Sequence, residues 1–256
     1  MDYPTKLFHY TSINNLALIL KSKKVKFSRL DHVNDLTEAG TCDMGNVGQY
    51  FFVSCWTDIE EESLPFWNMY TDKMSGVRIE LSFPILKSDK NGGITFNELI
   101  IHDDDKTYLL LSDNYSLKKI FYDNNIDNLN PNFWIPDNEG LDALDINENI
   151  GILKHEMWEF ESEWRYIVMV IPTERAKIMD DTLSDKYVIT GGVFSKERKV
   201  EINELFFEFN EDTFKNLRLK LGAKCSDAEF IIVEALLKQY NPNAKLEWSD
   251  FKGKIK

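Results

Sequence analysis

The spacing of apolar residues near the start of the chain changes at residue 12. Residues 7–8 form a short apolar run, whereas residues 13–20 place apolar side chains at three- and four-residue intervals, as on one buried face of a helix. The hydroxyl of Thr11 or Ser12 can cap this helix by accepting an amide proton of its first turn. His9 therefore lies where a strand gives way to a helix, and such junctions open toward ligands in many mixed folds.

Alternating or dense apolar segments predict further elements along the chain. Strands are expected over 24–30, 49–57, 76–83, 163–171, 200–210 and 244–251, and helices over 62–72 and 227–240. The pattern of segment 102–124 suggests a strand and also allows a helix, and the segment that follows it is rich in Asn and Asp. Because strands and helices mix without regular βαβ alternation, the pattern favours an α+β fold over a doubly wound sheet.

Length and composition are consistent with a single domain over residues 1–256. The chain is 43% hydrophobic and 13% aromatic, which is enough to bury a large core. No linker rich in Pro, Gly or Ser divides it, and no internal repeat is apparent. Residues 89–150, whose pattern is least regular, are a candidate insertion.

The charge balance is acidic, with 43 Asp and Glu against 30 Lys and Arg and a net charge of -13. Such a field repels polyanions, so general nucleic-acid binding is disfavoured, although a local phosphate pocket stays open. The N-terminus lacks the pattern of a signal peptide, and no apolar run reaches the roughly 20 residues of a membrane span. We therefore expect a soluble cytoplasmic protein that does not bind membranes.

Three cysteines, Cys42, Cys55 and Cys225, lie far apart and form no CxxC pair. We expect them to be reduced and mostly buried thiols. Several common sites lack their motifs: there is no GxGxxG, no GxxxxGK[ST] and no GxSxG. The histidines do not fall at metal-ligand spacing, so no metal site is predicted. They are His9, His32, His102 and His155.

The segment "WEFESEWRY" is the strongest candidate for chemistry. Glu161 and Glu163 are two residues apart, so an extended backbone would direct both carboxylates to one face. Glu163 enters an apolar strand, where a carboxylate is costly unless it is paired or functional. The simpler alternative is an ion pair between Glu163 and Arg165 at a sheet edge.

Other candidates also have structural interpretations. Trp67 and Tyr70 share one helical face, and aromatic residues in that arrangement usually belong to a core. Asn34 and Asp35, with Glu38 in the same loop, are typical of turns because such side chains bond to nearby backbone. A single histidine such as His9 is likewise more often structural than catalytic.

Together these stretches resemble a large bacterial family catalogued as domain of unknown function 2971. The resemblance rests on "FHYTS" at 8–12, "NDLTE" at 34–38, "VSCWT" at 53–57, "WNMY" at 67–70 with Gly76 and Val77 after it, and "ESEWR" at 161–165. Further matches at 221–226 and 246–251 extend it over nearly the whole chain. Leu36 replaces the proline that is usual in the second motif.

That family looks related to the diphtheria-toxin-like branch of the ADP-ribosyltransferase superfamily. The resemblance implies a split antiparallel sheet with NAD bound between its halves. It also implies an NAD-dependent transferase that acts on an unidentified protein or nucleic-acid acceptor, in a toxin or defence effector. Two alternatives stay open: an NAD glycohydrolase, and a catalytically silent module that binds a nucleotide or a protein.

The resemblance also suggests roles for individual residues. His9-Tyr10-Thr11 is similar to the H-G-T motif that binds the adenosine-side ribose and the nicotinamide amide, with Tyr10 in place of Gly. The ring of Trp67 or Tyr70 would stack on nicotinamide, and a glutamate would contact the other ribose and stabilise the oxocarbenium-like transition state. The candidate NAD-binding residues are His9, Tyr10, Thr11, Asn34, Asp35, Ser54, Trp67, Tyr70 and Arg165, and the catalytic candidates are Glu163 and, less favoured, Glu161.

Overall fold

A computed structural model describes most of the chain. The described residues are 3–35, 37–87, 100–103, 106–111, 117–136, 144–173 and 199–255. The candidate insertion at 89–150 lies partly outside these ranges. No helix among the described residues is long and apolar enough to cross a membrane.

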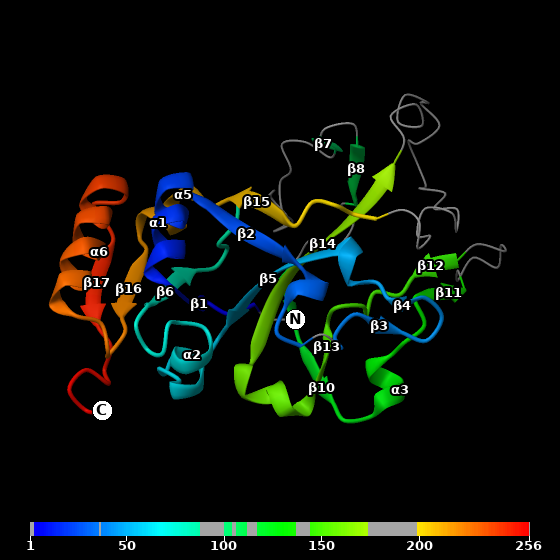
Figure 1. The fold of residues 1–256 in the computed structure, drawn as a ribbon, viewed down its shortest axis with the longest axis horizontal. Coiled ribbons are helices and arrows are strands. Elements are labelled where there is room, and N and C mark those ends of the chain that lie inside the picture. Colours follow the sequence, from blue (N-terminus) through cyan, green and yellow to red (C-terminus); the bar gives the residue numbers. More distant parts are fainter. Residues whose placement is uncertain are drawn as a thin grey trace.

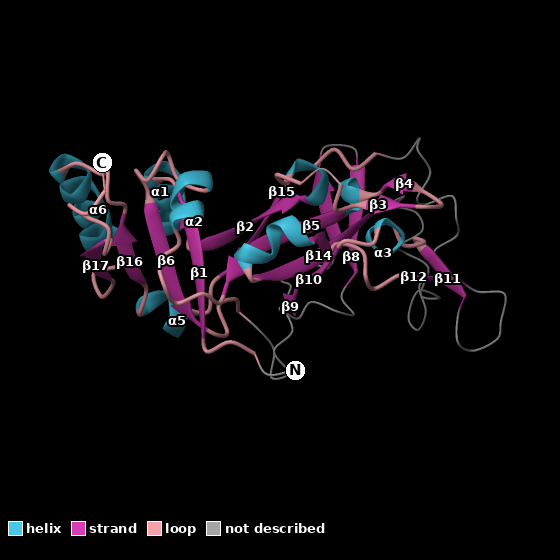
Figure 2. Cartoon of the chain, turned by 90° about the horizontal axis from the view of Figure 1, so that it is seen from below, coloured by secondary structure: helices cyan, strands magenta, loops and turns pink. Residues whose placement is uncertain are grey.

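A large, mostly antiparallel sheet forms the frame of the molecule (Figures 1 and 2). Among the described residues, its main path runs through β17 (Lys245–Trp248), β16 (Arg218–Leu221), β6 (Val77–Ser82), β1 (Lys6–Thr11), β5 (Phe51–Thr57), β14 (Glu163–Thr173), β8 (Lys106–Leu111) and β7 (Ile100–Asp103). Neighbours on this path are antiparallel, except that β16 and β17 are parallel. The prediction of mixed helices and strands around an antiparallel sheet is confirmed.

Shorter elements complete the described fold. β2 (Lys24–Arg29) pairs with β5 and β15 (Glu204–Glu208), and β9 (Lys118–Lys119) pairs with β14. Two-stranded pairs join β3 (Gly40–Thr41) to β4 (Gly45–Asn46), β10 (Phe121–Asp123) to β13 (Leu153–His155), and β11 (Trp134–Pro136) to β12 (Leu144–Ile146). The helices are α1 (Ile13–Ser22), α2 (Leu64–Met69), α3 (Ile126–Leu129), α5 (Glu211–Lys215) and α6 (Asp227–Tyr240), with 3-10 turns η1 (Leu30–His32), η2 (Gly48–Tyr50) and η3 (Glu156–Glu161).

Helix ends follow the capping signals in the sequence. The Ser12 hydroxyl accepts the amide proton of Asn15 and begins α1. A reciprocal pair of bonds between Ser226 and Glu229 begins α6 at its predicted position. The helix expected over 62–72 is shorter, because it begins after the cap Ser63 and ends at Met69. In segment 102–124 the described residues contribute to strands β7, β8, β9 and β10 and form no helix.

The main core lies between the sheet and the helices that cover it. Leu16 and Leu20 point from α1 into this core, and α1 packs beside α6 (Figure 1). A second, smaller core forms around α2, where Tyr10 of β1 packs against Phe66 and Trp67. β1 therefore contributes side chains to both cores, which fixes its position at the centre of the fold.

The sheet opens along one edge of β5. Phe52 and Val53 of this strand pair with β2, whereas Thr57 pairs with Phe8 of β1. The intervening residues, 54–56, lie where these two neighbouring strands separate, while the opposite edge of β5 stays paired with β14 throughout. Phe8 and Thr57 are the one pair in the register of β1 with β5, whereas on its other edge β1 pairs with β6 along its whole length. Side chains near the end of β1 and along β2 therefore face a gap in the sheet.

Two leucines of α1 give a matched test of this packing. Leu16 is fully buried, whereas Leu18 is 66% exposed. We expect Leu16→Ala to lower the free energy of unfolding by about 2–5 kcal/mol, because it leaves a cavity in the main core. Leu18→Ala should change that free energy by less than about 0.5 kcal/mol. Urea denaturation measures both variants, and equal losses would contradict this orientation of α1.

Candidate functional site

A cavity of about 600 Å³ occupies the opening of the sheet. Its walls come from β1, α1, β2, β5 and α2, and its polar end comes from β14 and Lys154. The volume falls in the range of small-molecule sites, and apolar walls with a few convergent polar groups are typical of such sites. Among the candidate residues, the lining includes His9, Tyr10, Thr11, Asn34, Ser54, Tyr70, Glu161, Glu163 and Arg165.

His9 bridges the opening beside β5. Its Nδ1 lies 3.0 Å from the carbonyl oxygen of Cys55. Cys55 is one of the β5 residues that lie between the pairing of this strand with β2 and its pairing with β1. A carbonyl only accepts, so Nδ1 carries the proton and Nε2 is left as an acceptor in neutral His9. Burial lowers the pKa of His9, which favours the neutral ring. The residue thus has a structural contact on one nitrogen and an acceptor on the other.

The residues next to His9 are also held by local contacts. The Tyr10 hydroxyl accepts the amide proton of Ser63 at 3.3 Å, and the Tyr10 ring packs edge-on against Trp67. Thr11 Oγ1 accepts a hydrogen bond from Asn15 at 3.0 Å. Tyr10 and Thr11 line the cavity, but their contacts also stabilise the start of α1 and the second core.

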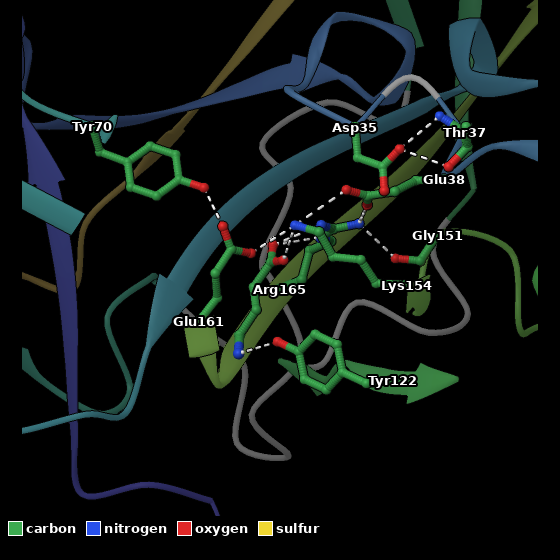
Figure 3. A network of polar contacts seen from close by, with 10 residues as sticks. Asp35, Thr37, Glu38, Tyr70, Tyr122, Gly151, Lys154, Glu161 and Arg165 are labelled. Atoms are coloured by element: carbon green, nitrogen blue, oxygen red, sulfur yellow. Dashed lines mark hydrogen bonds and ion pairs between the residues drawn. The ribbon is translucent and has the colours of Figure 1, made fainter. Parts of the chain in front are cut away.

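Trp67 and Tyr70, the two candidate stacking rings, have different positions. Trp67 is fully buried, donates its indole proton to Glu62, and does not line the cavity. Tyr70 lines the cavity, and its hydroxyl donates to Oε1 of Glu161 (Figure 3). The geometry therefore favours Tyr70 over Trp67 as a ring that a ligand can contact.

Five buried ionisable side chains form the polar end of the cavity, which we call the charge cluster: Glu38, Lys154, Glu161, Glu163 and Arg165. Figure 3 labels four of them, all except Glu163. Lys154 Nζ lies 2.6 Å from Glu161 Oε2, 3.1 Å from Glu163 Oε2 and 3.3 Å from Glu38 Oε1. One ammonium group therefore contacts all three acidic side chains.

Arg165, two positions after Glu163 on β14, completes the charge cluster. Its Nε donates to Glu163 Oε1 at 2.8 Å, and its Nη1 donates to Glu38 Oε2 at 2.5 Å. The same Nη1 donates to the carbonyl of Gly151 at 2.8 Å. The predicted ion pair between Glu163 and Arg165 is therefore present, but it lies in the interior of the protein beside the cavity.

The two glutamates reach this position by a different backbone path from the expected one. Glu161 ends η3, and Ser162 adopts a left-handed conformation with φ 42° before Glu163 begins β14. The prediction of one extended segment is therefore wrong for Glu161. Both carboxyl groups still meet at Lys154, because the turn at Ser162 brings the end of η3 over the start of the strand. The Tyr122 hydroxyl accepts the amide proton of Glu163 at 2.8 Å and supports this turn.

The electrostatics differ between the two glutamates. Burial opposes ionisation of Glu163, but the positive charges of Arg165 and Lys154 outweigh it and hold the pKa of Glu163 at about 2. Burial raises the pKa of Glu161, and the negative charge of Glu163 adds to this effect, while Lys154 offsets only part of it. Glu163 is therefore a stable anion, and Glu161 is the carboxyl group better suited to carry a proton.

The remaining candidates, Asn34, Asp35 and Ser54, also differ in whether they line the cavity. Asn34 is exposed and lines the cavity. Asp35 accepts from the backbone and hydroxyl of Thr37 at 2.9 and 2.6 Å, as the turn interpretation predicts, and it does not line the cavity. Ser54 lines the cavity and accepts the indole proton of Trp56 at 3.0 Å.

Lys154 is the residue that sequence reasoning did not identify as part of the site. Its signal is a charged residue directly after the run "IGIL", where the preceding apolar residues indicate burial. Glu38 was interpreted only as a loop residue. Among the described residues, no group of three or more His, Cys, Asp or Glu is arranged to hold a metal ion.

The cysteines agree with the sequence only in part. All three are free thiols, with Cys225 buried and Cys55 partly buried, but Cys42 is exposed, contrary to the expectation. Burial, together with the charge of Glu163, raises the pKa of Cys55 well above its usual value. Cys55 therefore lines the cavity as a neutral thiol and not as a nucleophile.

One family model matches part of the chain. The family described as "Protein of unknown function (DUF2971)" matches residues 66–166, a span that includes most of α2, Lys154 and both candidate glutamates but not His9. This match supports the family resemblance noted from the motifs. Neither a curated protein nor a solved structure matches the chain.

The ionised state of Glu163 predicts a loss of stability in acid. Its pKa is about 2 in the folded protein against 4.5 for a free carboxyl, so its stabilising contribution is present above pH 4.5. That contribution is lost as the pH falls from 4.5 toward 2. We expect the loss to be on the order of 3 kcal/mol in the free energy of unfolding.

Urea denaturation across this pH range tests the assignment. Glu163→Gln should remove that part of the acid dependence, because Gln does not titrate. Glu159→Gln, a matched change at an exposed site on η3, should keep the wild-type dependence. An unchanged acid profile in Glu163→Gln would contradict the assigned charge state.

Proposed function

We propose that the cavity binds NAD and that the protein transfers ADP-ribose from NAD to an unidentified macromolecular acceptor. One observation carries the proposal: His9, Tyr70 and the pair Glu161 and Glu163 come from three separate parts of the chain and line the same cavity. Residues that only stabilise local structure have no reason to gather around one cavity.

The chemistry of the lining suits cleavage of the bond between nicotinamide and ribose. As that bond breaks, nicotinamide leaves with the bonding electrons and positive charge develops on the ribose. The anionic carboxylate of Glu163 can stabilise this charge, and Glu161 can hydrogen-bond a ribose hydroxyl. The Tyr70 ring offers a face for the flat cationic nicotinamide, and neutral His9 offers an acceptor for a ribose hydroxyl.

The arrangement of strands gives further support. In the ADP-ribosyltransferase-like fold that the motifs suggest, NAD lies between the halves of a split antiparallel sheet. Here the cavity lies where β1 separates from β2 along the edge of β5. The resemblance further suggests a bacterial toxin or defence effector whose acceptor is a protein or a nucleic acid.

A second candidate function is a catalytically silent module that binds a nucleotide or a protein partner. The charge cluster favours it, because Lys154 and Arg165 already occupy both Glu163 oxygens. Tyr10, where the related motif has Gly, also fills space beside the cavity. An NAD glycohydrolase, in which water is the acceptor, is the alternative within enzymes.

The enzymatic proposal predicts a sharp effect of Glu163→Gln. Gln keeps the size of the side chain but removes the charge that stabilises the transition state, so turnover should fall by about a hundredfold or more while NAD binding changes little. Release of nicotinamide from NAD measures turnover, and calorimetry measures binding. The matched Glu159→Gln variant should keep wild-type turnover, because Glu159 is exposed and does not line the cavity.

The outcomes separate the candidates. Full activity in Glu163→Gln would remove Glu163 from the mechanism, and a loss confined to Glu161→Gln would move the catalytic role to that residue. Binding of NAD without nicotinamide release by the wild type would favour the binding module. With labelled NAD and a cell lysate, label on a macromolecule supports transfer, whereas free ADP-ribose alone supports hydrolysis.

A further inference from the structure

The charge cluster has one acidic group more than it has cations. It contains three carboxyl groups and two positive side chains, Lys154 and Arg165. Five of the six carboxyl oxygens receive a hydrogen bond, but Glu38 Oε1 is buried without one. That oxygen lies 3.3 Å from Lys154 Nζ as an ion pair only. An unsatisfied carboxyl oxygen beside a cavity is a position where a ligand can supply a donor or a positive charge.

A buried excess negative charge is costly, so the charge cluster needs one further proton or cation to balance it. Glu161 is the natural position for a compensating proton, because Glu38 and Glu163 each contact both Lys154 and Arg165, whereas Glu161 contacts only Lys154 of these two cations. The Tyr70 hydroxyl beside Glu161 can also accept a hydrogen bond from a protonated carboxyl group. The upward shift of the pKa of Glu161, caused by burial and by Glu163, agrees with this assignment. A positively charged ligand would remove the need for that proton.

We propose that the polar end of the cavity, beside Glu38 and Tyr70, binds a planar organic cation and that binding releases one proton from Glu161. Where the cation is the nicotinamide ring of NAD, the proposal rests on the proposed function. The guanidinium group of an acceptor side chain is also a planar organic cation and is the second source of this chemistry. The balance is simple: protonated Glu161 and the free cation give ionised Glu161, the bound cation and one proton in solvent. No covalent bond other than that O–H bond changes.

The groups around Glu161 allow this exchange. The titratable and charged side chains near it are Glu38, Tyr70, Tyr122, Lys154, Glu163 and Arg165, with Glu156 and Glu159 on η3 itself. Asp58 and Lys119 bind the adjacent Ser162. Glu163 is held as an anion by two cations, the tyrosines stay neutral because burial raises their pKa, and Lys154 stays charged. Glu161 is therefore the group whose protonation the ligand can change.

Two probes with the same ring test the proposal. Nicotinamide is neutral, whereas 1-methylnicotinamide is a cation of almost the same shape. We expect the affinity for 1-methylnicotinamide to rise about tenfold per pH unit while Glu161 holds its proton, and to level off at pH values above the pKa of Glu161. The affinity for nicotinamide should not depend on pH in this range. Titration calorimetry in buffers of different ionisation enthalpy counts the released proton directly.

Variants assign the effect to named residues. Glu161→Gln should abolish the pH dependence of 1-methylnicotinamide binding and weaken binding at high pH, because the excess negative charge is gone. Glu38→Gln should weaken binding about tenfold or more, since it removes charge beside the cation. The exposed Glu159→Gln variant should retain the wild-type pH dependence and affinity. Methylguanidinium as a third probe shows whether the site prefers a pyridinium ring or an acceptor-type guanidinium.

Several results would overturn the proposal. The proposal is excluded if nicotinamide and 1-methylnicotinamide bind with equal affinity, or if the cation binds without proton release at any pH. Both measurements use the wild-type protein, so they do not depend on whether the variants fold. The test is also separate from that of the proposed function. Proton-linked cation binding without nicotinamide release from NAD would support this inference and contradict the proposed enzymatic activity. NAD cleavage without proton-linked cation binding would support the enzymatic activity and contradict this inference.

Discussion

The contact of one buried ammonium group with three carboxyl groups is the interaction on which the site depends. Lys154 draws together Glu38 from a loop, Glu161 from the end of η3 and Glu163 from the start of β14. Without this ammonium, three acidic groups could not share a buried volume, because their mutual repulsion and desolvation would favour protonation or local unfolding. Arg165 adds a second positive charge beside Glu163 but makes no contact with Glu161, so the two glutamates differ in how readily they ionise.

The second constraint is the way β5 changes partners. Its edge pairs with β2 at one end and with β1 at the other, and the residues between them border the cavity. The unpaired carbonyl of Cys55 is satisfied by His9, so a single histidine closes the backbone gap and presents its second nitrogen as an acceptor. The structural and the functional interpretations of His9 are therefore compatible, because they use different atoms of the ring.

Local periodicity was sufficient to predict the elements but not their contacts. α6 lies at its predicted bounds, β5 falls within its expected segment, and β14 begins at the expected residue and extends two residues further, because side-chain spacing and capping act over a few residues. The contact between Glu38 and Arg165 joins residues 127 positions apart and depends on how distant strands pair. The left-handed turn at Ser162 had no glycine to signal it, so Glu161 was wrongly placed on an extended strand. Lys154 was missed because only the folded structure shows its three partners.

A crystal structure of the protein with NAD tests the central claim most directly. The account predicts that the nicotinamide ring lies against Tyr70 and that a ribose hydroxyl lies about 3 Å from a carboxylate oxygen of Glu161 or Glu163, which is hydrogen-bond distance. The ring would then occupy the space beside Glu38. NAD bound elsewhere on the protein, or bound in the cavity with its nicotinamide ring away from the charge cluster, would contradict the account.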